Sequence, residues 1–495
     1  MGRCWHVGAV SIALSALLFG ACGDDLSRCA QVSSVIPPAP PCAREPCTDL
    51  FVAAHPDDDL LFMGADIAGA LAANHRVVVI YVTAGELTGA DDQYWLDRER
   101  GVLNAYSALA DHLDGTHTAL VGNSPGVLPG EWAAAQPTVL GSITAAEYDL
   151  RTVPITAVFL RLGDYQEQCL WEQTNGCSSH NPNPPAPPYV AVTVACPGNA
   201  SSGKLACPTP APAQQVDDGA LAGALEAAIE RFHPTTIGML DASGVFFDGL
   251  GPAQATAGYT EYPDHYYSAL YALSATLRAA AVTGELPEIA SYRGYTITRE
   301  PANLTDSVAC TKDLAFDAYA PFDAYVGMEH DFYAIDDPQS YQRRSYALRT
   351  VPPRSGVLHN QDHCLGVVAS SATMVECAVA PVWTHDATGQ LSNNGQCLRV
   401  VDNGGHVVRP SPQCSGSPCN PIPVEFPAEV VVVEPCGTPT EASTFAVFDN
   451  GQIRTAYARC LSISSDQPFS ADCAAVVVDG HVTGGVPDGQ AWTFN

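Results

Sequence analysis

Short apolar runs alternate with helix-like stretches over residues 49–281, and this alternation constrains the fold more than any other feature. Four runs predict strands, at 49–54, 76–82, 157–162 and 235–240. Four amphipathic or Ala/Leu-rich stretches predict helices, at 60–73, 94–110, 217–232 and 266–281. Alternation of this kind predicts an α/β fold with a Rossmann-like, mostly parallel sheet and helices on both faces. Such folds bind ligands at the carboxyl ends of their strands.

One histidine and three aspartates follow the first predicted strand directly, in Ala54-His55-Pro56-Asp57-Asp58-Asp59. A histidine and a carboxylate three positions apart on a turn, His55 and Asp58, can both reach one metal ion. Asp57 between them stays free to act on a metal-bound water, and His265 is the best third ligand. Two histidines and one carboxylate form a set that catalytic zinc uses, with one position left open. The same ligand types also accept iron or cobalt.

These residues also have simpler explanations. An aspartate run can mark a helix N-terminus, where the macrodipole favours negative charge, and His265 could be an ordinary buried histidine. Arg98 could contact a substrate or form a surface ion pair, which contributes little. Asp241 follows the strand at 235–240, where it could bind substrate at the rim of the site or cap local structure. The combination of His55, the preceding strand and His265 favours the metal site.

The tail repeats one short unit three times, which is a different kind of sequence. Each unit opens with Gly and a following Leu or Ile, continues with Cys-Leu, and closes on Trp or Phe. The units begin at Gly356, Gly389 and Gly451, and they close on Trp383, Phe445 and Trp492. Because each unit is too small to bury its own core, the repeat predicts a threefold all-β domain.

The cysteines predict disulfides and an oxidising compartment. Of 18 cysteines, eight lie between Cys29 and Cys310 and eight between Cys364 and Cys473. An even number in each part fits disulfides formed within separate domains, and the chain has no CxxC spacing that would favour zinc clusters. Residues 168–215 hold four of these cysteines and many prolines, which predicts a disulfide-pinned surface insertion.

The N-terminus predicts export. A positive residue, a short apolar run at 7–19 and small residues at 20–22 are typical of a signal peptide over residues 1–21. The ending Leu-Phe-Gly-Ala-Cys resembles a bacterial lipobox, which implies lipidation of Cys22 and a Pro-rich tether over 22–47. We therefore expect either a lipid-anchored protein of the bacterial cell envelope, with membrane contact only through the anchor, or free secretion.

The charge balance excludes one class of partner. The chain carries 22 basic and 53 acidic residues, for a formal net charge of −31. Nucleic-acid binding relies on Lys and Arg to release counterions from phosphates, so we expect no nucleic-acid partner. The excess charge is best explained by a solvated surface.

The first part resembles the PIG-L/LmbE de-N-acetylases over residues 48–345. The resemblance rests on the run from Ala54 to Asp58 together with Thr83-Ala84-Gly85, Arg98-Glu99, Phe159-Leu160-Arg161-Leu162 and Pro263-Asp264-His265. It implies one Zn²⁺ per catalytic domain held by His55, Asp58 and His265, Asp57 as general base, and an N-acetylated amino sugar or glycan as substrate.

One position departs from that family's pattern. Tyr262 stands where family members commonly carry a helper histidine, and a tyrosine hydroxyl donates a hydrogen bond but ordinarily titrates near ~10. Tyr262 could fill the catalytic role itself, or Tyr259 or His233 could stand in. The departure also keeps an alternative open, a glycan-binding surface protein whose deacetylase-like domain is catalytically idle.

The tail resembles the ricin-type β-trefoil over residues 350–495. The resemblance implies the pairs Cys364–Cys377, Cys397–Cys414 and Cys460–Cys473, which leave Cys419 and Cys436 for each other. Sugar-binding units of that family usually carry an aspartate just after Cys-Leu, where this chain has Gly366, Arg399 and Ser462. A carbohydrate at the trefoil and a trefoil that has lost sugar binding are both open.

Overall fold

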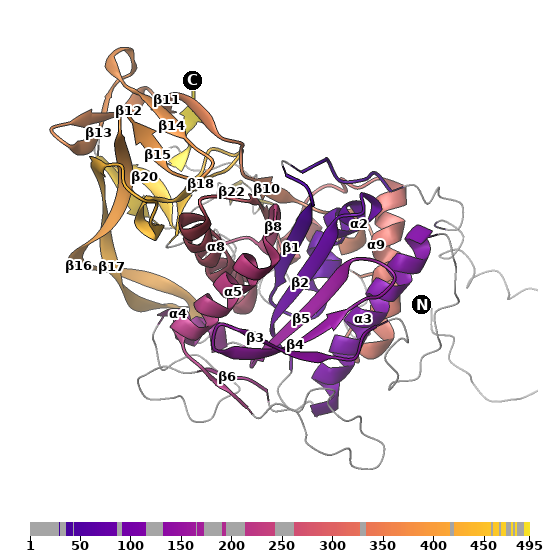
Figure 1. The fold of residues 1–495 in the computed structure, drawn as a ribbon. Helices are drawn as coiled ribbons and strands as arrows, with labels where there is room; N and C mark the ends of the chain where they lie inside the picture. Colours follow the sequence, from indigo (N-terminus) through magenta and orange to yellow (C-terminus); the bar gives the residue numbers. More distant parts are fainter. Residues whose placement is uncertain are drawn as a thin grey trace, which may run out of the picture.

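The fold is described from a computed structural model. It describes residues 29, 36–42, 44–86, 92–114, 132–164, 166–172, 191–194, 213–242, 262–326, 333–415, 420–456, 459–464, 467–471, 477–478, 481–482 and 490–495. The expected signal peptide, Cys22 and most of the expected insertion lie outside these residues. A helix-covered sheet and an all-β body lie side by side, the latter in orange and yellow (Figure 1). None of the described helices combines the length and apolar character needed to cross a bilayer.

An eight-stranded sheet forms the first body, in the order β10-β9-β8-β1-β2-β5-β4-β3. Five neighbouring strands run parallel, and three edge strands run antiparallel to their neighbours. The parallel strands are β9 (Glu288–Tyr292), β8 (Thr236–Leu240), β1 (Thr48–Ala53), β2 (Arg76–Thr83) and β5 (Ile155–Leu162). The edge strands are β10 (Ala347–Arg349), β4 (Ile143–Asp149) and β3 (Gln136–Leu140). The sheet is therefore mixed, and the sequence prediction missed β9 and the antiparallel edge strands.

Helices cover both faces of this sheet. On one face lie α4 (Gln166–Glu172), α5 (Asp218–Phe232) and α8 (Pro263–Thr283). On the other lie α2 (Gly64–Ala72), α3 (Asp92–Asp114) and α9 (Asp306–Tyr319). Because both faces are covered, the central strands are continuous apolar runs, and every residue of β1 is buried. The four predicted helices are present, whereas α4 and α9 were not predicted.

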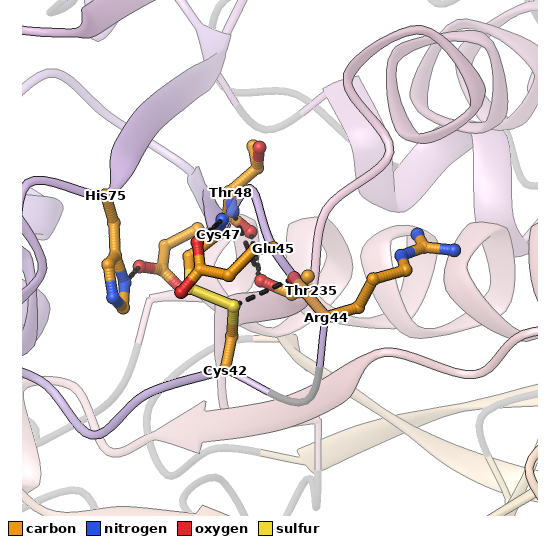
Figure 2. Close-up of a disulfide and its surroundings, with 8 residues drawn as sticks. Cys42, Arg44, Glu45, Cys47, Thr48, His75 and Thr235 are labelled. Carbon is orange, nitrogen blue, oxygen red and sulfur yellow. Dashed lines mark hydrogen bonds and ion pairs between the residues drawn. A yellow bond between two sulfur atoms is a disulfide. The ribbon is translucent and has the colours of Figure 1, made fainter.

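The amino edge of the sheet is held by polar contacts and a disulfide (Figure 2). Cys42 and Cys47 are bonded, and Thr48 at the start of β1 accepts a hydrogen bond on its carbonyl from Thr235 Oγ1 at 3.0 Å. His75 and Asp49 form a buried pair, with 2.7 Å between Nδ1 and Oδ2. The amino edge lies opposite the carboxyl ends of the parallel strands. A second disulfide joins Cys29 to Cys310 in α9.

The second body is antiparallel throughout its main sheet. Seven strands form a closed ring in the order β11-β12-β13-β17-β16-β15-β14. They are β11 (Arg354–Asn360), β12 (His363–Val368), β13 (Ser371–Glu376), β17 (Asn420–Pro435), β16 (Gln396–Ser415), β15 (Leu391–Asn393) and β14 (Val382–His385). Beyond the ring lie β18 (Phe445–Val447), β19 (Ile453–Thr455), β20 (Cys460–Ser464), β21 (Gln467–Ala471) and β24 (Thr493–Phe494). The pairs β22 (Val477–Val478) with β23 (His481–Val482) and β6 (Ala191–Val192) with β7 (Gln215–Val216) form two further small sheets.

The core of the all-β domain repeats as the sequence does. Equivalent residues of the three units are all buried: Leu358, Leu391 and Ile453 at the openings, Leu365, Leu398 and Leu461 after the cysteines, and Trp383, Phe445 and Trp492 at the ends. The two closing tryptophans make the same bond, since Trp383 Nε1 donates to Leu365 O and Trp492 Nε1 donates to Leu461 O, each at 2.9 Å. The repeat in the sequence is therefore a repeat in the packing.

Two expected disulfides are wrong, because Cys436, which was expected to pair with Cys419, is the partner of Cys397. Cys364 is bonded to Cys377 as expected, but Cys397 is bonded to Cys436 and not to Cys414. Cys397 lies near the start of β16, opposite the end of β17, whereas Cys414 pairs with Pro421 at the far end of the same long strand. A strand advances roughly 3.3 Å per residue, so Cys414 cannot reach Cys397. The expected partners Cys473 and Cys419 lie outside the described residues.

Disulfide mapping checks this correction. Non-reducing proteolysis followed by mass spectrometry should yield a peptide pair that links Cys397 to Cys436. A Cys414→Ser variant should keep that pair, because Cys414 takes no part in it, whereas Cys436→Ser should lose it. Recovery of a Cys397–Cys414 pair from the unreduced protein would contradict the structure.

Candidate metal centre and active site

The predicted metal motif forms a tight turn at the carboxyl end of β1, a central strand. The carbonyl of His55 accepts hydrogen bonds from the amides of Asp57 at 2.9 Å and Asp58 at 3.4 Å. Asp58 Oδ2 in turn accepts from the amide of His55 at 2.6 Å. The chain then enters a five-residue π-helical segment, η1 (Asp59–Met63), which continues into α2. π-Helical turns often occur at functional sites, and this one begins directly after Asp58.

The turn is held from both sides by buried side chains. Asp59 Oδ2 accepts hydrogen bonds from the hydroxyls of Tyr81 in β2 and Tyr106 in α3. On the other side, the amine of Lys312 donates to the carbonyl of Leu61 at 2.8 Å and to the carbonyls of Tyr341 and Arg344. Asp59, the third aspartate of the motif, therefore anchors the turn and does not face the histidines.

His55, Asp58 and His265 lie together, as the sequence predicts for three metal ligands. Their ligand atoms all lie within 4.8 Å of one another. Asp58 Oδ1 is 2.9 Å from His265 Nε2, and Asp58 Oδ2 is 3.3 Å from His55 Nδ1. Asp58 is fully buried and His265 is only 1 % exposed. A buried carboxylate between two imidazoles fits a divalent cation that takes mixed nitrogen and oxygen ligands.

The charges of this group favour an ionised carboxylate. Burial alone would raise the pKa of Asp58, but His265 and His55 hold it well below its ordinary value. Burial alone would lower the pKa of His55, but Asp58 and Asp264 raise it well above its ordinary value. A bound dication would take the place of these protons, because both imidazoles must be neutral to act as ligands.

Asp264 is a site residue that the sequence prediction missed. It is fully buried beside His265 in the first turn of α8, and its Oδ2 lies 3.3 Å from His55 Nε2. Metal-binding histidines commonly donate their second ring nitrogen to a carboxylate, which orients the ring. Asp264 therefore orients His55 while its neighbour His265 faces Asp58. The signal was present in the sequence, as an aspartate directly before the third predicted ligand.

Two more carboxyl groups lie at the ends of β2 and β5. Asp164 groups with His55 and Asp264, with one ligand atom of each within 4.8 Å of the others. The amide of Asp164 donates to Glu86 Oε1 at 3.0 Å. Burial raises the pKa of Asp164 to about 6 and that of Glu86 to about 9. Both lie within four residues of the end of a predicted strand, so their place at the carboxyl edge could have been inferred.

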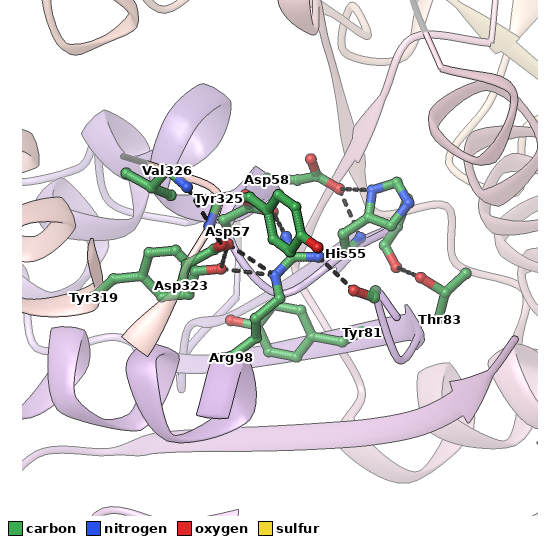
Figure 3. A network of polar contacts seen from close by, with 12 residues as sticks. His55, Asp57, Asp58, Tyr81, Thr83, Arg98, Tyr319, Asp323, Tyr325 and Val326 are labelled. Atoms are coloured by element: carbon green, nitrogen blue, oxygen red, sulfur yellow. Dashed lines mark hydrogen bonds and ion pairs between the residues drawn. The ribbon is translucent and has the colours of Figure 1, made fainter. Parts of the chain in front are cut away.

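Asp57, next to Asp58 in the turn, is held in place by Arg98 (Figure 3). Arg98 Nη2 lies 2.7 Å from Asp57 Oδ1, and its Nε lies 3.1 Å from Asp323 Oδ2. Nη1 donates to the carbonyl of Gly85 at 2.8 Å, and Nε also donates to the hydroxyl of Tyr319 at 2.8 Å. Burial raises the pKa of Asp57 to about 6, although Arg98 opposes that rise. Asp57 is thus a fixed carboxylate beside the metal ligands.

The structure decides one alternative for Arg98 and explains a nearby glycine. Arg98 is only 7 % exposed, so it forms no surface ion pair. Its described contacts are with protein groups, and they make it a support for Asp57. Gly85 has φ +67°, and a Cβ atom there would collide with Arg98 Nη1. The expected Thr83-Ala84-Gly85 turn therefore leaves room for the guanidinium.

Tyr262 lies at the rim of the site, next to both predicted histidine ligands. It precedes α8, is 43 % exposed, and its ring centroid is 6.3 Å from that of His55 and 5.9 Å from that of His265. Behind it, the half-buried ring of Tyr295 stacks on His265 at 5.0 Å, and Phe62 meets the same imidazole edge-on at 5.8 Å. Aromatic contacts therefore fix the orientation of His265, and Tyr295 was not predicted as part of the site.

Two other candidates are placed by the structure, and one lies outside the described residues. Asp241, a candidate for substrate binding or for a structural role, lies 3.1 Å from Arg454 of the all-β domain and accepts a hydrogen bond from Ser291 Oγ at 3.0 Å, contacts that fit the structural role. His233, a suggested stand-in for the helper histidine, ends α5 with φ 47°, three residues before β8 begins at the amino edge of the sheet. That edge is opposite the site. Tyr259 lies outside the described residues.

One segment of the chain matches a known protein family. Residues 50–111 match the PIG-L family model, described as GlcNAc-PI de-N-acetylase. The matched segment runs from β1 into α3, and it contains His55, Asp57, Asp58 and Arg98. No curated protein matches the chain.

Several of the solved structures to which the chain is similar are described as deacetylases. The zinc-inhibited form of the teicoplanin deacetylase Orf2 is 14 % identical with a TM-score of 0.29, and covers 55 % of this chain and 84 % of its own. A deacetylase–bog complex from the teicoplanin pathway is 13 % identical with a TM-score of 0.30, covering 59 % and 89 %. The 4-carboxy-2-hydroxymuconate hydratase GalB of Pseudomonas putida KT2440 is 12 % identical with a TM-score of 0.28, covering 58 % and 87 %. Likenesses at this level say nothing about a substrate.

Metal titration tests the ligand assignment. The full chain should bind one zinc ion, and His265→Ala should lose it at a metal concentration that saturates the unchanged protein. Asp264→Asn should weaken binding by about 10- to 100-fold, because the orienting carboxylate of His55 is lost.

The matched control is His75→Ala, which removes a buried, aspartate-paired histidine at the opposite edge of the sheet. It should leave the zinc stoichiometry unchanged. Full zinc occupancy in a folded His265→Ala variant would remove His265 from the ligand set.

Proposed function

We propose that the chain is a zinc-dependent amidohydrolase that removes acetyl groups from N-acetylated amino sugars. One observation carries the proposal: His55, Asp58 and His265 form a buried ligand set at the carboxyl end of β1, and Arg98 holds Asp57 beside it. The PIG-L match over residues 50–111 supports a de-N-acetylase-type reaction, because it contains four of these five residues. Zinc is proposed because a set of two imidazoles and one carboxylate is common in its hydrolytic sites.

The reaction adds one water across the amide C–N bond and gives acetate and a free amine. Bound zinc would supply Lewis acidity, which lowers the pKa of water towards ~7 and polarises a carbonyl. Asp57 would accept the proton of the attacking water and later return it to the leaving nitrogen. Arg98 keeps Asp57 oriented for both transfers, and Asp264 keeps His55 oriented through its second ring nitrogen.

Tyr262 would act as a hydrogen-bond donor at the rim. A hydroxyl at this place can stabilise negative charge that develops on the carbonyl oxygen. A tyrosine ordinarily titrates near ~10, so it is a poor proton shuttle at neutral pH, and Asp57 has to carry the proton transfer alone. We therefore expect a working but slower enzyme than one with a histidine at this position.

The remaining expectations belong to the same proposal. The threefold recurrence of buried residues supports a ricin-type β-trefoil over residues 350–495. Sugar binding is not favoured at the three positions that follow Cys-Leu. A Cβ at Gly366 would lie 2.7 Å from Val375, Arg399 is paired with Glu434, and Ser462 is buried. Export, with or without a lipid on Cys22, fits the four disulfides of the described residues.

Acetate release tests the proposal. Zinc-loaded protein incubated with N-acetylglucosamine oligomers should release acetate and free amine in equal amounts, and a chelator should abolish the release reversibly. Asp57→Asn should lower kcat by about 10²- to 10⁴-fold while zinc stays bound, because only the proton acceptor is lost. Asp49→Asn, a buried aspartate at the far edge of the sheet, is the matched control and should keep its activity.

A second function, a glycan-binding protein with an idle deacetylase-like domain, is favoured only by Tyr262. Its signature would be zinc binding without acetate release from any of a broad panel of N-acetylated sugars. If Tyr262→His then restored release, the missing histidine would explain the idleness. If neither the unchanged protein nor the Tyr262→His variant released acetate, the hydrolase proposal would fail.

A further inference from the structure

Part of the all-β domain packs into the core of the main sheet, while most of that domain keeps a core of its own. Ala446, Phe448 and Ala456, which lie in or beside the hairpin of β18 and β19, belong to the same buried core as the main sheet. Thr350, just after β10, donates its amide to Ile289 of β9 at 2.9 Å and forms a bridge with Phe448 on its other side. One isolated bridge therefore joins the edge of the main sheet, next to β10, to the hairpin of the all-β domain.

Arg454 reaches from this hairpin to the carboxyl edge of the main sheet. It lies in β19 and is only 1 % exposed. Nη2 lies 3.1 Å from Asp241 Oδ1, and Nη1 donates to Ser291 Oγ at 3.3 Å. Gln452 accepts from Nε and Nη2, and the guanidinium stacks over Phe448 at 4.3 Å from the ring centroid. A buried arginine with this many aimed contacts fixes the position of its partners.

Asp241 connects Arg454 to the metal centre. In the parallel pair of β1 and β8, Val52 lies opposite Met239, so continuing the register places Asp241 level with Ala54, next to His55. The turn after β1 carries His55 and Asp58, so the point that Arg454 holds lies beside two of the three proposed ligands.

We propose that Arg454 is a positioning residue of the metal centre, and that the all-β domain is thereby required for hydrolysis of even a small acetamide. In this proposal the all-β domain supports the metal centre itself, whereas a glycan-binding module would only deliver substrate. The inference rests on the proposed function for its kinetic readout, but its metal-affinity readout does not.

The test uses the full chain and compares three arginine variants at a temperature well below their unfolding midpoints. Arg454→Met should lower kcat by about 10- to 100-fold, since displacements near 1 Å at a reacting centre have effects of this size. KM for a monomeric N-acetylated sugar should change less than kcat, and zinc affinity, measured by competition with a chromogenic chelator, should fall. Arg454→Lys keeps the charge but not the two-pronged contact, and it should recover part of both losses.

Arg459→Met is the matched control. Arg459 is a buried arginine of the same domain, 3.0 Å from Glu429 of β17. Its loss should lower the unfolding midpoint as Arg454→Met does, but should leave kcat and zinc affinity unchanged. If Arg454→Met does not fold, Ser291→Ala replaces it, because it removes one partner of the guanidinium without leaving a buried charge, and it should shift kcat and zinc affinity in the same direction.

A double-variant cycle tests whether Arg454 acts on the metal centre through Asp241. If Arg454 acts through Asp241, Arg454→Met combined with Asp241→Asn should cost no more than the larger single change. Unchanged kcat and zinc affinity in folded Arg454→Met, or additive effects in the double variant, would overturn the inference. If the unchanged protein hydrolyses nothing, the proposed function fails separately, and zinc affinity alone then decides the role of Arg454.

Discussion

The structure depends on one buried charge, the carboxylate of Asp58, which is fully enclosed between the imidazoles of His55 and His265. Leaving such a charge unpaired would cost several kcal/mol, about 3–5 by analogy with broken buried pairs. One imidazole comes from the turn after β1 and the other from the first turn of α8. The centre can therefore form only when the sheet and α8 are assembled.

The surrounding residues serve this centre in two groups. Polar partners fix the reacting side chains: Asp264 orients His55, and Arg98, supported by Asp323, fixes Asp57. Aromatic rings fix His265, with Tyr295 stacked on one side and Tyr262 at the open rim. The all-β domain keeps its own core, but it joins this arrangement through Arg454 and through a hairpin that packs into the core of the main sheet.

The sequence was sufficient for features that depend on local pattern. Alternating runs predicted the central strands and four helices, and the spacing of His55 and Asp58 predicted that they would meet. It was insufficient where distant segments decide the outcome. Asp241 lies at the expected edge of the sheet, but Arg454 of the all-β domain binds it. Cys397 is bonded to Cys436 because β16 and β17 form one long hairpin that brings the two cysteines together. The antiparallel edge strands and Asp323 likewise carry no local signal of their place.

X-ray absorption at the zinc edge of the loaded full chain tests the central claim most directly. The account predicts about two imidazole nitrogens and additional oxygen ligands at roughly 2.0–2.2 Å, with no sulfur near ~2.3 Å. His265→Ala should lose one imidazole from this shell or lose the metal. A zinc ion bound through cysteine sulfur, or a shell without imidazole, would contradict a metal centre built on His55, Asp58 and His265.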